Sequence, residues 1–307
     1  MESGRETDTI LYEPTSEGIT TITIKRPHVR NAVNSEAALS LAAAFRAFEV
    51  DASQKVCLLT GAGDTFCAGY DLHEVAAQGH SSQHGSDDSS KSKNSSAPSP
   101  SRPSSLRFHH GPVDSTDPAT SPPAPMGPSR MRLSKPLIAA IAGHAVAGGL
   151  ELSLLADVRI ADETAVLGVF CRRFGVPLID GGTVRLQRVV GLGRAMDMIL
   201  SGRPVTAREA LHIGLVNRVV ERGSALREAR EYARALLGFP WACLLADRRS
   251  TFHAAFDARN LEDALRYEYE HGIKIVEQES LAGAARFAKG EGRKGTFATD
   301  DNVKSRL

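Results

Sequence analysis

The spacing of apolar residues predicts the order of strands and helices in the first part of the chain. Within residues 9–25, apolar and polar residues alternate, as expected for two half-buried strands joined by a turn at Glu17 and Gly18. From Asn34, a good N-cap residue, apolar positions recur at helical spacing as far as Phe48. The short apolar run at residues 55–60 is typical of a buried strand.

In the rest of the chain, strands again alternate with helices and then give way to helices alone. The pattern predicts strands at residues 136–142, 157–161, 165–169 and 215–220. It predicts helices at residues 148–155, 181–190, 194–200, 206–213, 226–237, 241–256 and 261–287. This order indicates an α/β fold, with a core at residues 1–235, a helical region at 236–300 and a tail at 301–307.

One segment interrupts this pattern with a different composition. Residues 79–125 consist mostly of Ser, Pro, His, Asp and Lys, which bury too little apolar surface to offset the entropy of ordering. We expect a disordered insertion in a surface loop rather than a linker between domains. It could be an inert spacer, a phosphorylatable tether or a mobile lid.

Composition and charge narrow the classes of protein that fit this pattern. The chain has 307 residues, of which 42% are hydrophobic and 24% charged, as is typical of a soluble globular protein. A net charge of +1 gives no broad basic field, so we expect no nucleic-acid partner. The four cysteines have no zinc-like spacing, and the polar N-terminus has no apolar stretch, so we expect free thiols and no secretory signal.

One apolar segment has the length of a membrane span. Residues 137–156 approach the ~20 residues that a bilayer requires. A glutamate such as Glu151 would be costly in lipid, and Gly148 and Gly149 indicate a break. We therefore expect a buried strand, a turn and a buried helix, and no membrane span.

Two glycine-bearing turns are candidates for binding negative charge. FCAGYDL at residues 66–72 follows one predicted strand, and GHAVAGGLE at residues 143–151 joins another to a helix. Glycines at such a turn let backbone N–H groups point outward together, and a helix N-terminus adds a favourable dipole. Two such groups can bind one developing oxyanion, although the glycines could equally serve only close packing.

Several motifs, taken in order, resemble those of the crotonase superfamily, the enoyl-CoA hydratase/isomerase family. The resemblance covers nearly all of the chain outside residues 79–125. It rests on RP at residues 26–27, RNA at 30–32, FCAGYDL at 66–72 and SKPLIAAIAGHAVAGGLELSLLADVRIA at 134–161. It continues through GVPLIDGGTVRLQRVVG at residues 175–191 and SGRPVTAREALHIGLVNRVV at 201–220. Each motif is weak alone, but the ordered set is highly specific.

The resemblance implies a fold, a ligand and a set of binding residues. The fold would be a spiral of β-β-α units whose C-terminal helices mediate a homotrimer or hexamer. The ligand would be an acyl-CoA, with coenzyme A as part of the substrate, no separate cofactor and no metal. The amides of Tyr70 and Gly148 would form the oxyanion hole. Coenzyme A would lie along Arg30, Ala68, Tyr70, Asp71, Leu72 and His73, the last at a position where lysine is common in the family.

Glu151 is the main candidate for proton transfer. It follows Gly148 by three residues on the same predicted helix, which places its carboxylate on the face above that amide. Because Leu150 and Leu152 flank it, we expect burial to raise its pKa, as suits acid–base catalysis. It also occupies one of the two glutamate positions of the family's hydratases. The alternative is a buried structural glutamate paired with an arginine such as Arg159.

The second hydratase glutamate is missing from this chain. Its position is occupied by Cys171, for which we expect a small buried thiol rather than a nucleophile. Asp180 is a candidate replacement, because family members carry a catalytic aspartate close to this point. An aspartate before Gly181 and Gly182 is equally suited to cap the following helix, and one carboxylate could do both.

Three functions fit these residues. The first is an enoyl-CoA hydratase-like lyase, in which Tyr70 and Gly148 hold a thioester enolate, Glu151 moves the proton and Asp180 assists. The second is an enoyl-CoA isomerase or an acyl-CoA thioester hydrolase, which the loss of one glutamate motivates. The third is a coenzyme A-binding pseudoenzyme without catalysis.

The last residues predict a location. Ser305, Arg306 and Leu307 form a conservative variant of the S-K-L peroxisomal signal. We therefore expect a peroxisomal import receptor as a partner and a role in peroxisomal β-oxidation of fatty acids, with the cytoplasm as the alternative location.

Overall fold

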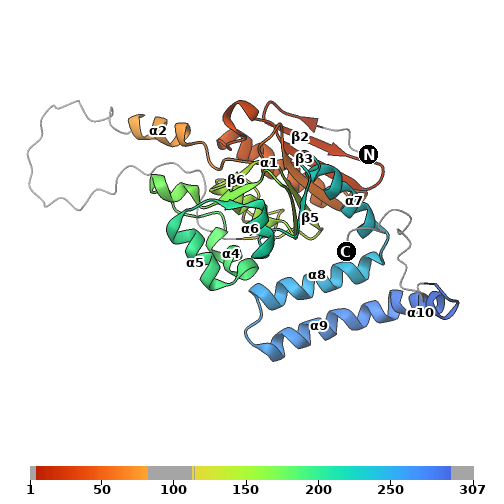
Figure 1. The fold of residues 1–307 in the computed structure, drawn as a ribbon. Coiled ribbons are helices and arrows are strands. Elements are labelled where there is room, and N and C mark those ends of the chain that lie inside the picture. Colours follow the sequence, from red (N-terminus) through yellow and green to blue (C-terminus); the bar gives the residue numbers. More distant parts are fainter. Residues whose placement is uncertain (1–4, 82–112, 114, 292–307) are drawn as a thin grey trace, which may run out of the picture.

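A computed structural model describes residues 5–81, 113 and 115–291, and these form the α/β fold expected from the sequence (Figure 1). In this part of the chain, seven strands make a large sheet in the order β1-β2-β3-β4-β5-β7-β10. They are Arg5–Glu6, Ile10–Pro14, Ile19–Ile24, Val56–Gly61, Leu137–Ile141, Val158–Asp162 and Arg218–Val220. β1, β2 and β3 pair antiparallel, whereas the pairs from β3 to β10 are parallel.

A smaller sheet gives the fold its repeat. It contains β6 (His144–Val146), β8 (Val166–Gly168) and β9 (Val205–Thr206). β6 follows directly on β5, and β8 follows directly on β7, so the chain twice passes from the large sheet to the small sheet and then into helices. These are the expected β-β-α units. The helices that follow are α3 (Gly148–Leu155), η2 (Phe170–Phe174), α4 (Gly182–Val190) and α5 (Leu192–Ser201).

Helices cover both faces of the large sheet. α1 (Ser35–Val50) begins at its Asn34 cap, as predicted, and buries Phe45 and Phe48 on one face. α7 (Ala225–Leu237) covers the other face with alanines spaced four residues apart. Along β4, Cys57 and Leu59 face the α1 side while Val56 and Leu58 face α7. A strand covered on both faces needs apolar residues throughout, which explains its uninterrupted apolar run.

The C-terminal helices lie apart from the sheets. α8 (Trp241–Phe256) and α9 (Leu261–Ile275) run side by side in Figure 1, and a π-helical turn (Val276–Ser280) leads into α10 (Leu281–Ala288). This confirms the helical C-terminal region, and the boundary predicted at residue 235 falls near the end of α7. The shorter elements are η1 (Pro27–Val29), α2 (Leu72–Ser81) and α6 (Ala207–His212).

The segment before β5 is more ordered than its composition suggests. Ser121 and Ala124 are buried, and Arg46 of α1 donates hydrogen bonds to the carbonyls of Pro118 and Ser121 at 3.0 and 2.8 Å. The prediction of disorder is therefore wrong for residues 79–81, which are helical, and for 115–125. Main-chain hydrogen bonds rather than apolar side chains hold the latter, and composition does not reveal them. Residues 82–112 and 114 lie outside the described residues.

The apolar segment at residues 137–156 contains the predicted buried strand, β5, and the predicted buried helix, α3, but the expected turn between them includes the short strand β6. Among the described residues, no helix combines the length and apolar character needed to cross a bilayer. The predicted signal at Ser305, Arg306 and Leu307 lies outside the described residues.

Candidate active site

The two glycine turns meet at one edge of the small sheet. Cys67 N donates to the carbonyl of His144 at 2.8 Å, which joins the first turn to β6. A side chain on Gly149 would overlap the carbonyl of Cys67, so only glycine allows this approach. Gly69 has φ +101°, and a Cβ added there would lie 3.0 Å from Gly148 N. The turns that the sequence places far apart are therefore packed directly on each other.

The amides of Tyr70 and Gly148 belong to these turns. Tyr70 forms a parallel bridge with Val33 in which Val33 N donates to the carbonyl of Gly69 at 2.8 Å, so the N–H of Tyr70 points the other way. Gly148 begins α3, where N–H groups have no intrahelical partner and the helix dipole favours negative charge. Ala147 before it has φ 53° and ψ −124°, a strained conformation for a residue with a side chain.

Glu151 is buried in α3, with 3% of its surface exposed. Its Oε1 accepts hydrogen bonds from the backbone N–H groups of Asp180 and Gly182, at 2.9 and 2.8 Å. Burial, and secondly the negative charge of Asp180, raise the pKa of Glu151 to about 7, although the two N–H groups oppose this shift. The expectation that burial raises this pKa is confirmed, and the group is poised for proton transfer near neutral pH.

Arg159 is directed away from Glu151. Its Nε donates to the carbonyl of Leu215 at 2.8 Å and its Nη1 to the carbonyl of Ala156 at 2.6 Å. The alternative of a structural pair between Glu151 and Arg159 is therefore wrong. The backbone N–H groups of Asp180 and Gly182 bind Glu151 instead. Their position depends on the path of the chain from the end of η2 to the start of α4.

Asp180 is buried beside Glu151, but its carboxylate faces a different segment. Its Oδ1 accepts hydrogen bonds from Met126 N, at 3.0 Å, and from Ser129 Oγ. The N-cap of α4 is Gly181, and that cap has no side-chain hydrogen bond. The capping alternative is therefore wrong, because the carboxylate points toward residues 126–129 and not toward the helix. The catalytic role of Asp180 stays a prediction.

Cys171 lies within electrostatic reach of Glu151. Burial, and secondly the negative charge of Glu151, raise the pKa of the Cys171 thiol. The side chain is free and 8% exposed, which confirms the expected small buried thiol. A thiol held in its neutral form is a poor nucleophile, which agrees with the expectation that Cys171 is not one.

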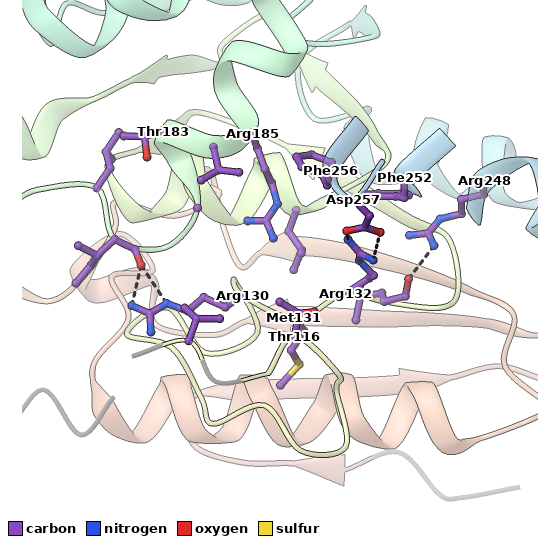
Figure 2. A pocket seen from close by; sticks show the side chains of 17 residues that line it. Thr116, Arg130, Met131, Arg132, Thr183, Arg185, Arg248, Phe252, Phe256 and Asp257 are labelled. Atoms are coloured by element: carbon purple, nitrogen blue, oxygen red, sulfur yellow. Dashed lines mark hydrogen bonds and ion pairs between the residues drawn. The ribbon is translucent and has the colours of Figure 1, made fainter. Parts of the chain in front are cut away.

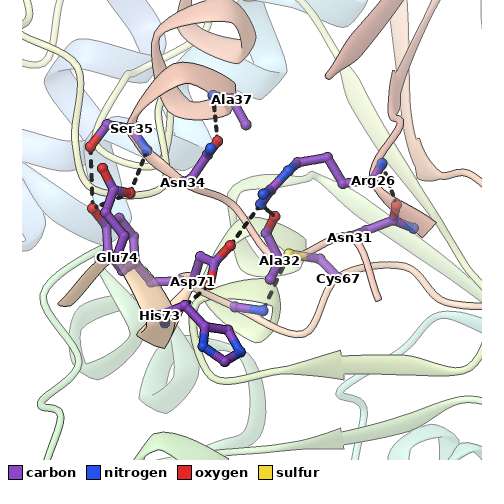
Figure 3. A network of polar contacts seen from close by, with 12 residues as sticks. Arg26, Asn31, Ala32, Asn34, Ser35, Ala37, Cys67, Asp71, His73 and Glu74 are labelled. Atoms are coloured by element: carbon purple, nitrogen blue, oxygen red, sulfur yellow. Dashed lines mark hydrogen bonds and ion pairs between the residues drawn. The ribbon is translucent and has the colours of Figure 1, made fainter. Parts of the chain in front are cut away.

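The residues expected along coenzyme A lie in and beside the first turn, where Figure 3 shows Asp71 and His73. Ala68 N donates to the carbonyl of Arg30 at 3.0 Å, so these two segments are adjacent. Asp71 is buried and forms an ion pair with Arg26, with 3.1 Å between Nη1 and Oδ2, so its carboxylate supports the turn. Arg30 and His73 are exposed at the surface of this region, as is Leu72. This leaves the two basic side chains open to a ligand.

The side chain of Tyr70 is held by a contact that the sequence did not indicate. Its hydroxyl donates to Glu74 Oε2 at 3.1 Å, and the same oxygen accepts from Ser35 N at 2.8 Å (Figure 3). Glu74 thereby ties α2 to the start of α1. The spacing of four residues between Tyr70 and Glu74 is the signal that could have suggested it.

A cavity of 510 Å³ lies next to Ile179 and Gly181, the two neighbours of Asp180 in the chain. It is bounded by the loop before β5, the start of α4 and α8 (Figure 2). Its apolar lining includes Met131, Leu155 and Phe252. Arg132 also lines the cavity and forms a bidentate ion pair with Asp257, in which Nη1 and Nη2 donate to Oδ2 and Oδ1 at 2.6 and 2.7 Å. In the part of the chain that the structure describes, no three His, Cys, Asp or Glu side chains come together as metal ligands.

Comparison with known proteins gives one consistent family. A family model described as enoyl-CoA hydratase/isomerase matches residues 14–97 and 130–298. An enoyl-CoA hydratase of Mycobacterium tuberculosis is 32% identical over 276 residues, covering 87% of this chain and 89% of that protein. A protein of Arabidopsis thaliana, named probable enoyl-CoA hydratase 1, peroxisomal, is 30% identical over 285 residues, covering 93% of this chain and 90% of that protein. The crystal structure of an enoyl-CoA hydratase from Mycobacterium marinum is similar with a TM-score of 0.73 and 27% identity, covering 92% of this chain and 96% of that chain.

Proposed function

Because this chain belongs to the enoyl-CoA hydratase/isomerase family and is an enzyme of that family, we propose that it adds water to the double bond of an enoyl-CoA. One observation carries this proposal. Glu151, with a pKa near 7, is buried on the same helix whose first amide belongs to Gly148, and the Tyr70 turn packs against that helix start. This arrangement supports Glu151 as the acid–base group and the amides of Tyr70 and Gly148 as the oxyanion donors.

In the proposed reaction, the thioester carbonyl oxygen accepts hydrogen bonds from the N–H groups of Tyr70 and Gly148. Negative charge develops on this oxygen as water adds to the β-carbon, and donors fixed in advance stabilise it by a few kcal/mol each. Glu151 accepts a proton from the attacking water and returns a proton to the α-carbon. A single carboxylate can complete the cycle in this way, which fits a chain with Cys171 at the second glutamate position.

The proposal also covers how the chain binds coenzyme A, how it assembles and where it is located. The exposed Arg30 and His73 lie where the phosphates of coenzyme A can be met by positive charge. The exposed apolar side chains of α9 support a homotrimer or a hexamer. The plant relative, whose name includes the peroxisome, supports that location.

Isomerisation or thioester hydrolysis is the second candidate, and Cys171 favours it. Both reactions use the same oxyanion donors and one acid–base group: isomerisation moves a proton between carbons without water, and hydrolysis adds water to the thioester carbonyl carbon and releases coenzyme A as the thiol. The alternative of a pseudoenzyme is set aside, because the family match supports an enzyme and Glu151 is intact.

Mass-resolved product analysis with trans-2- and trans-3-enoyl-CoAs separates these functions. A product heavier than the trans-2 substrate by one water supports the hydratase. Interconversion of the two enoyl-CoAs without a change in mass identifies an isomerase, and release of free coenzyme A identifies a hydrolase. Binding of these enoyl-CoAs without any turnover would contradict all three reactions.

A further inference from the structure

The segment before β5 lies directly on the second glycine turn. In it, Ala124 and Gly127 exchange two main-chain hydrogen bonds, at 2.8 and 2.7 Å, and Gly127 has φ +74°. Met126 lies within this tight turn and is fully buried. A Cβ added to Gly148 would lie 2.5 Å from the Sδ of Met126 and 2.8 Å from its Cγ. The thioether therefore covers the residue whose amide begins α3.

Asp180 holds the turn in this position. Its Oδ1 accepts from Met126 N at 3.0 Å and from the hydroxyl of Ser129, which is fully buried. Its own N–H donates to Glu151 Oε1 at 2.9 Å. One residue thus connects the acid–base group to the segment that covers Gly148. We call Met126, Ser129 and Asp180 the clasp.

The cavity of 510 Å³ begins where the clasp ends. Ile179 and Gly181, on either side of Asp180, line it, as do Arg130 and Met131, which follow Ser129 (Figure 2). The guanidinium of Arg130 donates to the carbonyl of Ile179 at 2.9 and 3.1 Å, which joins the two segments above the clasp. The clasp therefore lies between Gly148 and a cavity that is lined by apolar side chains and by four arginines.

We propose that Met126 is a specificity-determining residue and Asp180 a positioning residue, which together close the site to long acyl chains. This inference rests on the proposed function, because the thioester must lie at Gly148. The substrate class is then short acyl groups that end in front of the Met126 thioether. The affinity for an acyl chain grows with each methylene that is buried, so opening the clasp would let longer chains gain affinity from the cavity.

Binding of saturated acyl-CoAs tests this without requiring turnover. The dissociation constants of butanoyl-CoA and dodecanoyl-CoA are measured by calorimetry for wild type and Met126→Ala. We expect wild type to gain nothing from the longer chain. We expect Met126→Ala to shift the ratio of the two constants at least ~tenfold toward dodecanoyl-CoA, because the chain enters the cavity.

Two variants serve as matched controls. Met126→Leu keeps a side chain of similar volume and should keep the wild-type ratio. Met198→Ala removes the same atoms from the buried side of α5, away from the clasp, and should also leave the ratio unchanged. Far-UV circular dichroism confirms that each variant is folded.

Substitutions at Asp180 separate positioning from catalysis. Asp180→Asn retains an oxygen that can accept both hydrogen bonds, so it should keep the acyl-length ratio, whereas Asp180→Ala should shift it as Met126→Ala does. A loss of turnover on the order of 100-fold or more in Asp180→Asn, with the acyl-length ratio kept, would overturn the positioning role and assign Asp180 to catalysis. Removing this charge should also move the limb of the pH–rate profile that belongs to Glu151 to lower pH.

Two results would overturn the clasp proposal alone: tighter binding of dodecanoyl-CoA than butanoyl-CoA by wild type, or an unchanged ratio in folded Met126→Ala. Failure of wild type to bind either acyl-CoA would instead overturn the proposed function together with it.

Discussion

At the scale of single residues, the chemistry depends on how the surroundings of Glu151 balance its two protonation states. Burial and the charge of Asp180 favour the neutral carboxyl, while the N–H groups of Asp180 and Gly182 favour the carboxylate. The resulting pKa of about 7 lets one group both accept and return a proton near neutral pH. The flanking leucines indicated the burial, but the two amide donors depend on the path of residues 180–182 in space.

The pH dependence of catalysis should report this balance. If Glu151 acts as the base toward water, kcat/KM rises as the pH increases through about 7 and then levels off, because the carboxylate is the active form. The profile is measured with a short trans-2-enoyl-CoA for wild type and for Cys171→Ala. The Cys171→Ala control should keep the same rise through about pH 7, because the Cys171 thiol of the wild type is held neutral and contributes no charge. A flat profile across neutral pH would contradict this role.

The same pKa predicts how stability depends on pH. The pKa of Glu151 is about 7 in the folded protein and near the ordinary 4.5 in the unfolded chain, so the folded state binds more protons between these values. Stability should therefore fall as the pH rises through this window, by up to ~3 kcal/mol. Urea unfolding at the two ends of the window should show this loss in wild type and not in Glu151→Gln. Equal pH dependence in both proteins would contradict it.

At the scale of elements, the site exists because two turns touch, one that follows β4 and one that joins β6 to α3. The apolar run at residues 136–142 was enough to predict β5, the glycines and apolar residues at 148–155 predicted α3, and the cap at Asn34 predicted α1. β6 and β9 were missed because three and two residues are too short to show an alternation. The contact between the turns, and the clasp at Met126, arise from long-range packing that no local pattern encodes.

Gly149→Ala should separate the two turns. The added methyl group would overlap the carbonyl of Cys67, which belongs to rigid backbone. We expect a loss of about 1–3 kcal/mol in stability, as for other overpacked sites, and a fall in kcat/KM because the two amides move apart. Gly193→Ala in α5 is the control, since its added Cβ meets no atom within 4 Å. Wild-type melting temperature and activity in Gly149→Ala would refute the close contact.

At the scale of the whole molecule, α8 and α9 extend away from the sheets and leave apolar surface uncovered. The large exposed side chains on α9 and at the start of the π-helical turn recur along one face at helical spacing, namely Leu261, Leu265, Tyr269, Ile273 and Val276. An exposed apolar stripe of this kind is typical of an interaction surface. The family resemblance implies that further copies of this chain cover it in a symmetric assembly.

Light scattering should therefore give a mass of three or six times 32.8 kDa for wild type. The double substitution Leu265→Glu and Ile273→Glu places charge in the apolar stripe and should lower the mass toward that of the monomer. Glu262→Gln, on the exposed surface of the same helix, should leave the assembly unchanged. A monomeric wild type would refute the predicted assembly but not the chemistry at Glu151.

Turnover of a short trans-2-enoyl-CoA by wild type and by Glu151→Gln tests most directly whether Glu151 is the acid–base group of this enzyme. We expect wild type to form the 3-hydroxyacyl-CoA and the variant to lose roughly 10²–10⁴-fold in kcat, because the amide cannot accept or return the proton. Binding of butanoyl-CoA, measured in parallel, should change little. Retention of wild-type turnover by Glu151→Gln would contradict the assignment of the acid–base role to this residue.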